Sequence, residues 1–549
     1  MRRALCTAVL LFMTACDSPK VNSGPVPTAA SKAPKETPVR GDMLVEASIG
    51  DASNLIPMLS ADAASMSISG LIYNGLVQYN PKWEIEGDLA ESWEIKDSGK
   101  TIVFHLRKGV KWHDGAPFTS ADVMFGYKTI IQPGTRTAYA EPYMQVKSAE
   151  APDDHTFIVH YEKPYAPALE SWGSLPVLPK HLLEGKDINN SPLSRKPVGT
   201  GPYKFVEWAA QERIILEANK EYFKGEPYLT RYAYRIVPDS ATQFLELKAG
   251  SIDMMALNPV QYARQTNNAE FEKNFQKFKY VANAYTYMGY NFQRPLFKDK
   301  RVRKAIAYAV DKNEIIQGAL MGLGKPAAVP YKPGTWMYNP KVQTYPFDSA
   351  KAQQLLAEAG WTQKDTDGIL MKDGKRFEFE IITNQGNDKR KKAAEIIQQR
   401  LKAVGIGVKF RVIEWSSFLK EFINKRNFDV CLLGWTTGPE PDQYEIWHSS
   451  KTKEQELNFI SFKNEEVDIL LEQGRRTFDQ SERKNIYDHF QDILAEEQPY
   501  LFLYYEEALP AVSARIKGIE LHESTMGIGY EWPVKWYVPK PLQKYAMQP

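Results

Sequence analysis

Cysteine and histidine are scarce in this sequence, and their spacing excludes two kinds of stabilising site. Of its 549 residues only three are cysteines, Cys6, Cys16 and Cys431. They form neither a disulfide framework nor the paired spacing of a zinc site. The eight histidines are scattered. His155 and His160 lie on one expected strand but face opposite sides of it, so they cannot share a metal. We therefore expect no metal site.

The short signatures of common catalytic sites are also missing. The sequence contains no G-x-S-x-G, no H-E-x-x-H, no complete phosphate loop and no dinucleotide fingerprint. The segment His113-Asp114-Gly115 could suggest acid–base chemistry, but a turn between two elements explains it better. A glycosidase-type pair of carboxylates would leave no signature, because its separation in space decides the chemistry. We expect no catalytic residue, no cofactor and no enzyme, with an extracytoplasmic hydrolase as the enzymatic alternative.

An excess of charge of one sign is absent as well. Lys and Arg number 69 against 67 for Asp and Glu, a net charge of +2. Such a balance argues against nucleic acid as a partner. The hydrophobic share of 43% and the charged share of 25% are ordinary for a globular protein, and the length suggests about two to four domains.

The N-terminal segment has the pattern of a signal peptide followed by a lipid anchor. Arg2 and Arg3 precede an apolar run, 4–13, that is too short to cross a bilayer. Thr14-Ala15-Cys16 resembles the bacterial lipobox, although Met13 stands where that motif prefers leucine. The expected signal peptide is therefore 1–15, with Cys16 lipidated. An ordinary signal peptide with an incidental cysteine is the alternative.

The residues after Cys16 predict a tether. Prolines recur among Ser, Thr, Ala and Lys up to residue 41 without a periodic apolar face, which is typical of a disordered, semi-extended segment. By resemblance to lipoprotein sorting in enteric bacteria, Asp17 would favour retention at the inner membrane. The expected location is extracytoplasmic, on the periplasmic side of the inner membrane, with the protein held by its lipid anchor.

Local patterns in the folded body predict both hairpins and α/β units. The turn 96–100 joins two strand patterns into a hairpin, and Thr119 with Asp122 forms a capping box for a helix over 120–130. Asp348 and Asp479 are expected to cap two later helices. The second half alternates helical stripes with short strands, which predicts a mostly parallel sheet with helices on both faces.

The stretch 428–447 changes character in its middle. Val430 to Leu433 fits a buried strand, and the aromatic, hydroxyl, glycine and proline residues from Gly434 onward are expected to end it. A strand end of this kind places exposed backbone and the indole of Trp435 at the edge of a sheet, where open α/β folds bind small molecules. The alternative is a plain strand end with Trp435 in the core.

Several blocks along the chain resemble family 5 extracellular solute-binding proteins, the receptors of peptide, nickel and related ABC importers. The similarity runs in order from about residue 43 to past 520. The blocks are Leu89-Ala-Glu-Ser-Trp-Glu94, Phe104-His-Leu-Arg-Lys-Gly-Val-Lys-Trp-His-Asp-Gly115, Pro197-Val-Gly-Thr-Gly-Pro-Tyr203, Asn219-Lys-Glu-Tyr-Phe-Lys-Gly225, Phe297-Lys-Asp-Lys-Arg-Val-Arg-Lys-Ala-Ile306, Leu355-Leu-Ala-Glu-Ala-Gly360 and Pro499-Tyr-Leu-Phe-Leu-Tyr-Tyr505.

The resemblance implies an α/β, two-lobed periplasmic-binding-protein fold of class II type with an inserted α+β domain. It places lobe I at 42–75, 200–285 and 505–549, the inserted domain at 76–199 and lobe II at 286–504. Ligand would bind between lobes that close over it. Expected partners are a peptide or other small solute and an ABC permease with cytoplasmic ATPase subunits. The chain is expected to act as a monomer, without nucleic acid.

The resemblance also implies where the ligand binds. Ligand-binding candidates are Asn54, Tyr73, Gly434, Trp435, Thr436, Thr437, Glu440, Asp442 and Tyr505, with Tyr73, Trp435 and Tyr505 as aromatic walls. Gly438 departs from the pattern, since enteric peptide receptors carry at that place an aspartate that pairs with the peptide amine. Glu440 or Asp442 could supply the carboxylate instead.

Because of this departure, the ligand class has alternatives. An oligopeptide is the leading expectation, and a metal chelate, an opine or an oligosaccharide is the second. A sensor or chaperone without its own permease is a further possibility.

Overall fold

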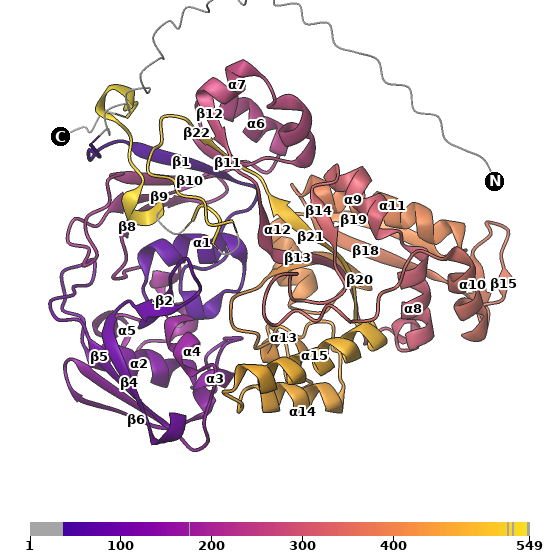
Figure 1. Cartoon of the computed structure of the whole chain (residues 1–549), viewed down its shortest axis with the longest axis horizontal. Coiled ribbons are helices and arrows are strands. Elements are labelled where there is room, and N and C mark those ends of the chain that lie inside the picture. The colour runs from indigo at the N-terminus through magenta and orange to yellow at the C-terminus, as the bar shows by residue number, and fades with distance from the viewer. Residues whose placement is uncertain (1–36, 175, 524–525, 530–531, 546–549) are drawn as a thin grey trace, which may run out of the picture. The chain divides into compact units, whose positions relative to one another are not determined.

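The computed structural model describes residues 37–174, 176–523, 526–529 and 532–545 (Figure 1). The chain divides into a unit of Met1–Thr37 and a unit of Pro38–Pro549, and the second contains all of the described helices and strands. The predicted signal peptide, Cys16 and the tether up to residue 36 lie outside the described residues. None of the described helices is both long and apolar enough to cross a membrane.

A seven-stranded mixed sheet contains strands from distant parts of the chain, in the order β12-β22-β11-β1-β10-β9-β8. Strand β1 pairs in parallel with β10 and β11, and the other pairs of this sheet are antiparallel. The strands are β1 (Met43–Ser48), β8 (Tyr203–Ala209), β9 (Arg213–Ala218), β10 (Arg231–Ile236), β11 (Met254–Ala256), β12 (Phe275–Lys277) and β22 (Pro510–Ser513). The buried guanidinium of Arg515, just after β22, pairs with Asp42 and Asp253, and so ties the C-terminal strand to the first one.

Helix α1 (Ala63–Ile72) meets the turn at 197–203 so closely that only glycine fits there. A Cβ on Gly199 would lie 1.9 Å from the carbonyl oxygen of Ile72, and one on Gly201 would lie 2.6 Å from that of Leu71. In return, the amide of Gly201 donates a 2.8 Å hydrogen bond to the Ile72 carbonyl at the end of the helix. The glycines of this turn therefore allow backbone-to-backbone contact.

An antiparallel four-stranded sheet, in the order β4-β5-β7-β6, fills the segment between α1 and this turn. The predicted hairpin and the helix 120–130 are confirmed, and Thr119 and Asp122 form both bonds of a capping box. The elements are β2 (Val77–Tyr79), β3 (Ile85–Gly87), β4 (Ala90–Lys96), β5 (Thr101–Leu106), α2 (Ser120–Ile130), α3 (Glu141–Met144), β6 (Val146–Asp153), β7 (Thr156–Tyr161), α4 (Ala168–Ser174) and α5 (Lys180–Leu183). This segment shares one continuous apolar core with a face of the seven-stranded sheet.

A six-stranded sheet, in the order β14-β21-β13-β20-β18-β19, forms the second half of the chain. The prediction of a mostly parallel sheet is wrong, because only β18 pairs in parallel, with β19 and β20, while the long strands β13 and β21 run antiparallel. The strands are β13 (Tyr280–Tyr290), β14 (Gly324–Pro326), β18 (Glu378–Asn384), β19 (Gly407–Ile413), β20 (Val430–Thr436) and β21 (Tyr500–Ala508). The lobe boundaries expected at 285 and 505 fall inside β13 and β21.

The composition of the sequence suggested that strand β20 ends at Gly434. In the structure the strand continues to Thr436. Trp435 lies opposite Tyr285 and Thr436 opposite Ala284 on β13. Since β13 extends past this point, it offers ladder partners that the local sequence of β20 does not reveal.

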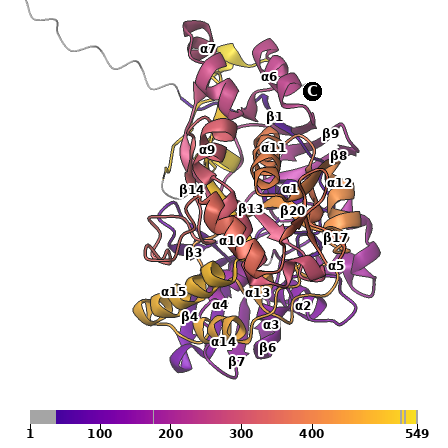
Figure 2. The same cartoon turned by 90° about the vertical axis from the view of Figure 1, so that its right-hand side faces the viewer.

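Helices cover the two faces of the six-stranded sheet, over two separate apolar cores. Asp348 and Asp479 accept the capping hydrogen bonds expected of them, from Lys351 and Glu482. The longer helices are α8 (Lys300–Ala309), α9 (Lys312–Leu320), α10 (Ser349–Glu358), α11 (Asp388–Ala403), α14 (Glu465–Gly474) and α15 (Gln480–Glu497), with the short α13 (Tyr444–Trp447) after β20. Helices α14 and α15 lie side by side in both views (Figures 1 and 2).

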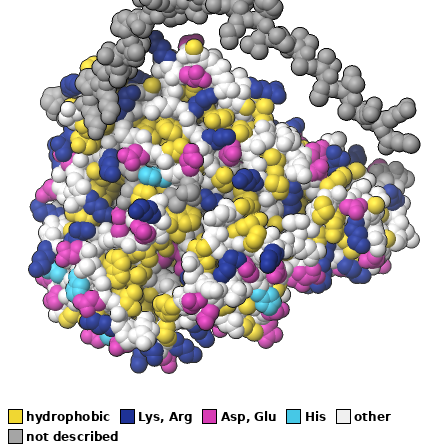
Figure 3. All heavy atoms as spheres, in the orientation of Figure 1, with side chains coloured by type: hydrophobic (Ala, Val, Ile, Leu, Met, Phe, Trp, Pro, Cys, Tyr) yellow, Lys and Arg dark blue, Asp and Glu magenta, His cyan; other side chains and the backbone are white. Residues whose placement is uncertain are grey.

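The fold also contains further helices and a small three-stranded sheet. They are α6 (Ser240–Ala249), α7 (Ala269–Asn274), α12 (Trp415–Ser417), α16 (Trp532–Lys535) and the small sheet of β15 (Gln363–Lys364), β16 (Leu370–Lys372) and β17 (Lys375–Arg376). On the face shown in Figure 3, Lys and Arg side chains are interspersed with Asp and Glu side chains, in keeping with the balanced composition.

Candidate functional site

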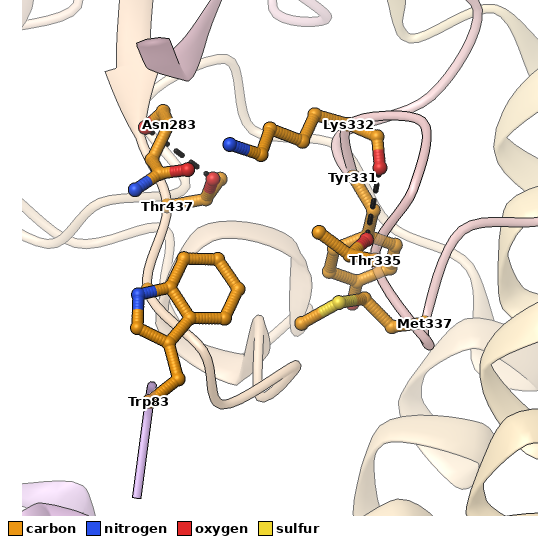
Figure 4. A pocket seen from close by; sticks show the side chains of 8 residues that line it. Trp83, Asn283, Tyr331, Lys332, Thr335, Met337 and Thr437 are labelled. Atoms are coloured by element: carbon orange, nitrogen blue, oxygen red, sulfur yellow. Dashed lines mark hydrogen bonds between the residues drawn. The ribbon is translucent and has the colours of Figure 1, made fainter. Parts of the chain in front are cut away.

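A cavity lies where β20 ends and the turn between β2 and β3 approaches it (Figure 4). Its space of about 180 Å³ is partly open to solvent. Its lining residues come from the β2–β3 turn, β13, the loop after β14 and the residues after β20, and they are Trp83, Asn283, Tyr331, Lys332, Thr335, Met337, Thr437 and Gly438. Elements of the six-stranded sheet and of the 76–199 segment thus enclose it together.

The strand pairing places Thr437 beside Asn283. After the last ladder pair of β20, the amide of Thr437 still donates a 2.7 Å hydrogen bond to the carbonyl oxygen of Asn283. From the other side, a turn closed by a 2.9 Å bond from the Trp83 amide to the Asn80 carbonyl presents the indole of Trp83. Trp83 adopts φ 63°, a left-handed conformation that is unfavourable for a bulky residue and often accompanies a functional role.

Lys332 brings a positive charge to the cavity. Its Nζ lies 5.7 Å from the centre of the Trp83 ring and 3.4 Å from the carbonyl oxygen of Val281. In Figure 4 the side chain reaches toward Asn283 and Thr437. Burial lowers the pKa of Lys332, because removal from water disfavours the ammonium form. An aromatic face, an amide, hydroxyls and an ammonium group therefore meet in one small space.

Two predicted aromatic walls lie in the core instead of the cavity. Tyr73 is the C-cap residue after α1 and is 3% exposed, and Tyr505 on β21 is 1% exposed. The hydroxyl of Tyr505 lies within hydrogen-bond distance of two carbonyl oxygens, 2.6 Å from that of Val329 and 2.7 Å from that of Tyr331, so this side chain supports the loop that carries Lys332. The aromatic residues that line the cavity are Trp83 and Tyr331, and the sequence analysis singled out neither of them.

The residues at the end of β20 have different environments. A Cβ on Gly434 would lie 2.7 Å from Nη2 of Arg390 and 2.9 Å from the carbonyl oxygen of Tyr285, which explains the glycine. Trp435 is half-buried, and its Nε1 lies 3.3 Å from the hydroxyl of Tyr500. Thr436 is exposed, and only Thr437 and Gly438 of this stretch line the cavity.

Asn54 lies apart from these residues, in a local turn. Its side-chain oxygen accepts a 2.8 Å hydrogen bond from the amide of Ile56, and its own amide donates to the hydroxyl of Ser65 at 3.2 Å. The structure gives Asn54 a role in shaping the loop before α1. Its contact with a ligand stays a prediction.

Glu440 and Asp442 already have cationic partners. Glu440 forms an ion pair with Arg483, and Asp442 lies 2.8 Å from Nη2 of Arg475. Burial nevertheless raises the pKa of Glu440, with Arg483 acting in the opposite direction. These guanidiniums already balance both charges, which weakens either carboxylate as a partner for a ligand amine at Gly438. Contact of Glu440 or Asp442 with a ligand stays a prediction.

The carboxylate that faces Gly438 belongs to Glu170 on α4. Its Oε1 lies 3.5 Å from where a Cβ on Gly438 would be, and its Oε2 accepts a hydrogen bond from the hydroxyl of Tyr79. Burial and the nearby Glu440 raise the pKa of Glu170 to about 8. Sequence reasoning missed Glu170, because nothing local distinguishes one glutamate on a short helix.

His113 and Cys431 do not line the cavity. His113 sits in a turn and contacts the backbone of Gly199 and Gly201 at 3.2 and 3.0 Å, in keeping with the interpretation of this segment as a turn. Cys431 is a buried thiol whose pKa burial raises to about 12. Among the described residues, no group of His, Cys, Asp and Glu is arranged to hold a metal ion.

Comparisons with known proteins agree on one family. Residues 84–456 match the family described as bacterial extracellular solute-binding proteins, family 5. The oligopeptide-binding protein AppA of Bacillus subtilis is 35% identical over 98% of both chains. Heme-binding protein A of Haemophilus influenzae is 30% identical over 93% of this chain and 95% of its own.

Solved structures show the same likeness in three dimensions. AppA of B. subtilis in complex with a nonapeptide has a TM-score of 0.87 at 34% identity, over 92% of this chain and all of that one. NikZ of Campylobacter jejuni in complex with Ni(L-His) has a TM-score of 0.82 at 30% identity, over 90% of this chain and 99% of its own. The expected α/β, two-lobed periplasmic-binding-protein fold with an inserted domain is thereby confirmed. The chain belongs to the bacterial extracellular solute-binding proteins of family 5.

Proposed function

We propose that this protein captures an oligopeptide between its two lobes and delivers it to an ABC importer. The observation that carries the proposal is the cavity at the end of β20, where Trp83, Asn283, Lys332 and Thr437 meet. An aromatic wall with a few convergent polar groups is typical of a binding site, and amide and hydroxyl groups can bond to the peptide groups of a ligand. The similarity to AppA, which binds a nonapeptide, supports the same ligand class.

The cavity suits a protein that closes around its ligand. Its walls belong to different parts of the fold, because Trp83 lies in the 76–199 segment and Asn283 on β13 of the six-stranded sheet. Contacts of Asp388 at the start of α11 with Ser240 and Asn258 join the two large sheets on another side. A ligand that touches both walls stabilises the closed form relative to the open one, and this difference in affinity is what drives closure.

A non-peptide solute is the second candidate. The likeness to NikZ in complex with Ni(L-His) favours a metal chelate, since that protein has the same fold at 30% identity. The amide, hydroxyl and ammonium groups that line the cavity can bind the polar groups of an amino-acid chelate as well as those at the end of a peptide. An opine or an oligosaccharide belongs to the same alternative.

The role outside the cytoplasm includes an anchor. The family consists of extracellular proteins, and we propose that Cys16 is lipidated and holds this one, as a monomer without enzymatic activity, at the periplasmic side of the inner membrane. The change Cys16→Ala should move the protein from the membrane fraction to the soluble fraction. Retention of the variant in the membrane fraction would contradict the anchor.

The ligand class is tested by thermal unfolding with peptide pools. A ligand at 100 times its Kd stabilises the folded state by about 2.7 kcal/mol, which raises the melting temperature. We expect a response to pools of synthetic oligopeptides and none to nickel–histidine complexes or to opines. A response to one of those solutes, together with none to peptides, would favour the second candidate. Native mass spectrometry of the purified protein would identify whatever copurifies.

A further inference from the structure

The surroundings of Glu170 contain more negative than positive charge. The charged groups that act on it are the carboxylates Glu440 and Asp442 and the guanidinium Arg483. Arg475 pairs with Glu141 and Asp442, and Arg483 pairs with Glu440. Among the described residues, no Lys, Arg or His forms an ion pair with Glu170.

The orientation of the Glu170 carboxylate is set by one hydrogen bond. Tyr79 on β2 donates to Oε2, which leaves Oε1 directed toward Gly438. Gly438 also lines the cavity, and because it has no side chain nothing stands between its backbone and Oε1. A ligand that reaches Gly438 from the cavity therefore meets an oriented carboxyl group that has no cationic partner among the described residues.

A carboxylate that is held in a partly buried, acid-rich place attracts a positive charge from a ligand. Resting on the proposed function, we propose that Glu170 binds a primary ammonium group of the peptide ligand beside Gly438. The ammonium belongs to the peptide N-terminus or to a lysine side chain, since both present the same donors.

This binding is linked to proton release. With a pKa raised to about 8, Glu170 carries its proton at pH 7. An incoming ammonium keeps its three protons and favours the ionised carboxylate, so the carboxyl proton leaves to the buffer and the charge of the ion pair balances. Affinity for a cationic peptide should therefore increase from pH 6 toward pH 8, until the α-amino group itself, with a pKa of roughly 7.7–8.0, loses its proton.

The probes that test this are pools of synthetic nonapeptides. One pool lacks lysine and has free N-termini, a second is the same pool acetylated at the N-terminus, and a third is acetylated but contains one lysine. We expect calorimetry to show the wild type binding the first pool at least about tenfold more tightly than the second. The heat should vary with the ionisation enthalpy of the buffer, since about one proton is released.

The variant Glu170→Gln should lose this preference and the proton release. The control Glu91→Gln, an exposed carboxylate on β4 of the same segment, should keep both. Binding of the third pool as tightly as the first would identify the lysine side chain as an equivalent source of the ammonium. Equal binding of the first two pools by the wild type, with no binding of the third in preference to the second, would overturn the proposal and leave the proposed function intact. Failure of all three pools to bind would overturn the proposed function itself.

A second variant separates recognition from a merely structural role. In the Glu170→Gln background, Gly438→Asp introduces a carboxylate at the same place, and the nearest atom to its Cβ is at an ordinary 3.5 Å. We expect the double variant to regain the preference for free amines. If its melting temperature matches that of Glu170→Gln and no preference returns, the position beside Gly438 does not bind the ammonium.

Discussion

Arg475 and Glu141 form a buried ion pair, although 334 residues separate them in the sequence. Arg475 directly follows α14, and Glu141 begins α3, so the pair joins the helices of the six-stranded sheet to the 76–199 segment. The same guanidinium bonds to Asp442 at 2.8 Å and lies 3.7 Å from the centre of the Tyr444 ring. One side chain thus connects the residues after β20 to the segment that carries Glu170.

Replacement of Arg475 should destabilise the protein strongly. Arg475→Leu leaves the carboxylates of Glu141 and Asp442 buried without a partner, and removal of one member of a buried pair costs about 3–5 kcal/mol. We expect a clear drop in melting temperature, measured by tryptophan fluorescence. The neighbouring Arg476→Leu is the control, because Arg476 is 52% exposed and its pair with Glu472 spans 3.6 Å. Equal effects of the two variants would contradict this account.

Two glycine-to-alanine changes should act in opposite directions. Gly199→Ala places a methyl group 1.9 Å from the Ile72 carbonyl oxygen, so the turn or the end of α1 must move, and stability should fall. Gly70→Ala lies within α1, is exposed and meets no atom within 4 Å. Alanine favours a helix interior over glycine by about 0.8–1.0 kcal/mol, so Gly70→Ala should stabilise. Unfolding in urea measures the free energy of unfolding of both variants. An unchanged stability of Gly199→Ala would show that the turn can relax.

Loss of the Trp83 indole should weaken ligand binding without unfolding the protein. Trp83→Ala removes one aromatic wall of the cavity, and aromatic contacts contribute about 0.5–1.5 kcal/mol beyond their buried area, so affinity for peptides should fall about tenfold or more. The matched control is Phe478→Ala, an aromatic that is 52% exposed and does not line the cavity. Calorimetry measures the peptide affinity of both variants. Unchanged binding by Trp83→Ala would place the ligand elsewhere.

Stability should decrease in mild acid because of His113. Burial lowers its pKa to about 4, and Nδ1 must accept from Gly199 while Nε2 donates to Gly201, which requires the neutral ring. The unfolded chain binds a proton near pH 6.5 and the folded one does not, so stability is lost as pH falls from about 6.5 to 4, by up to about 1.4 kcal/mol per pH unit.

The variant His113→Gln tests this dependence. Its unfolding free energy should fall less steeply between pH 6.5 and 4 than that of the wild type, measured in urea at several pH values. His489→Gln, which changes a 54% exposed histidine, should keep the wild-type slope. A slope in His113→Gln that equals that of the wild type would assign the acid sensitivity to other groups.

Short-range patterns were sufficient for the separate elements. The capping box at Thr119 and the caps at Asp348 and Asp479 are confirmed, because each depends on residues within one turn of a helix. The blocks of motif sequence were likewise enough to recognise the family, since they extend along most of the chain.

The way in which the elements meet follows from contacts that form only in the folded chain. Local sequence was enough to predict the caps, the hairpin, the balanced charge and the family. Local sequence could not show that β13 extends β20 to Thr436, or that Glu440 and Asp442 form ion pairs with arginines. It also could not show that Glu170 faces Gly438. Each of these depends on strand order and on contacts between residues far apart in the chain, and such contacts leave no periodicity or spacing in the local sequence.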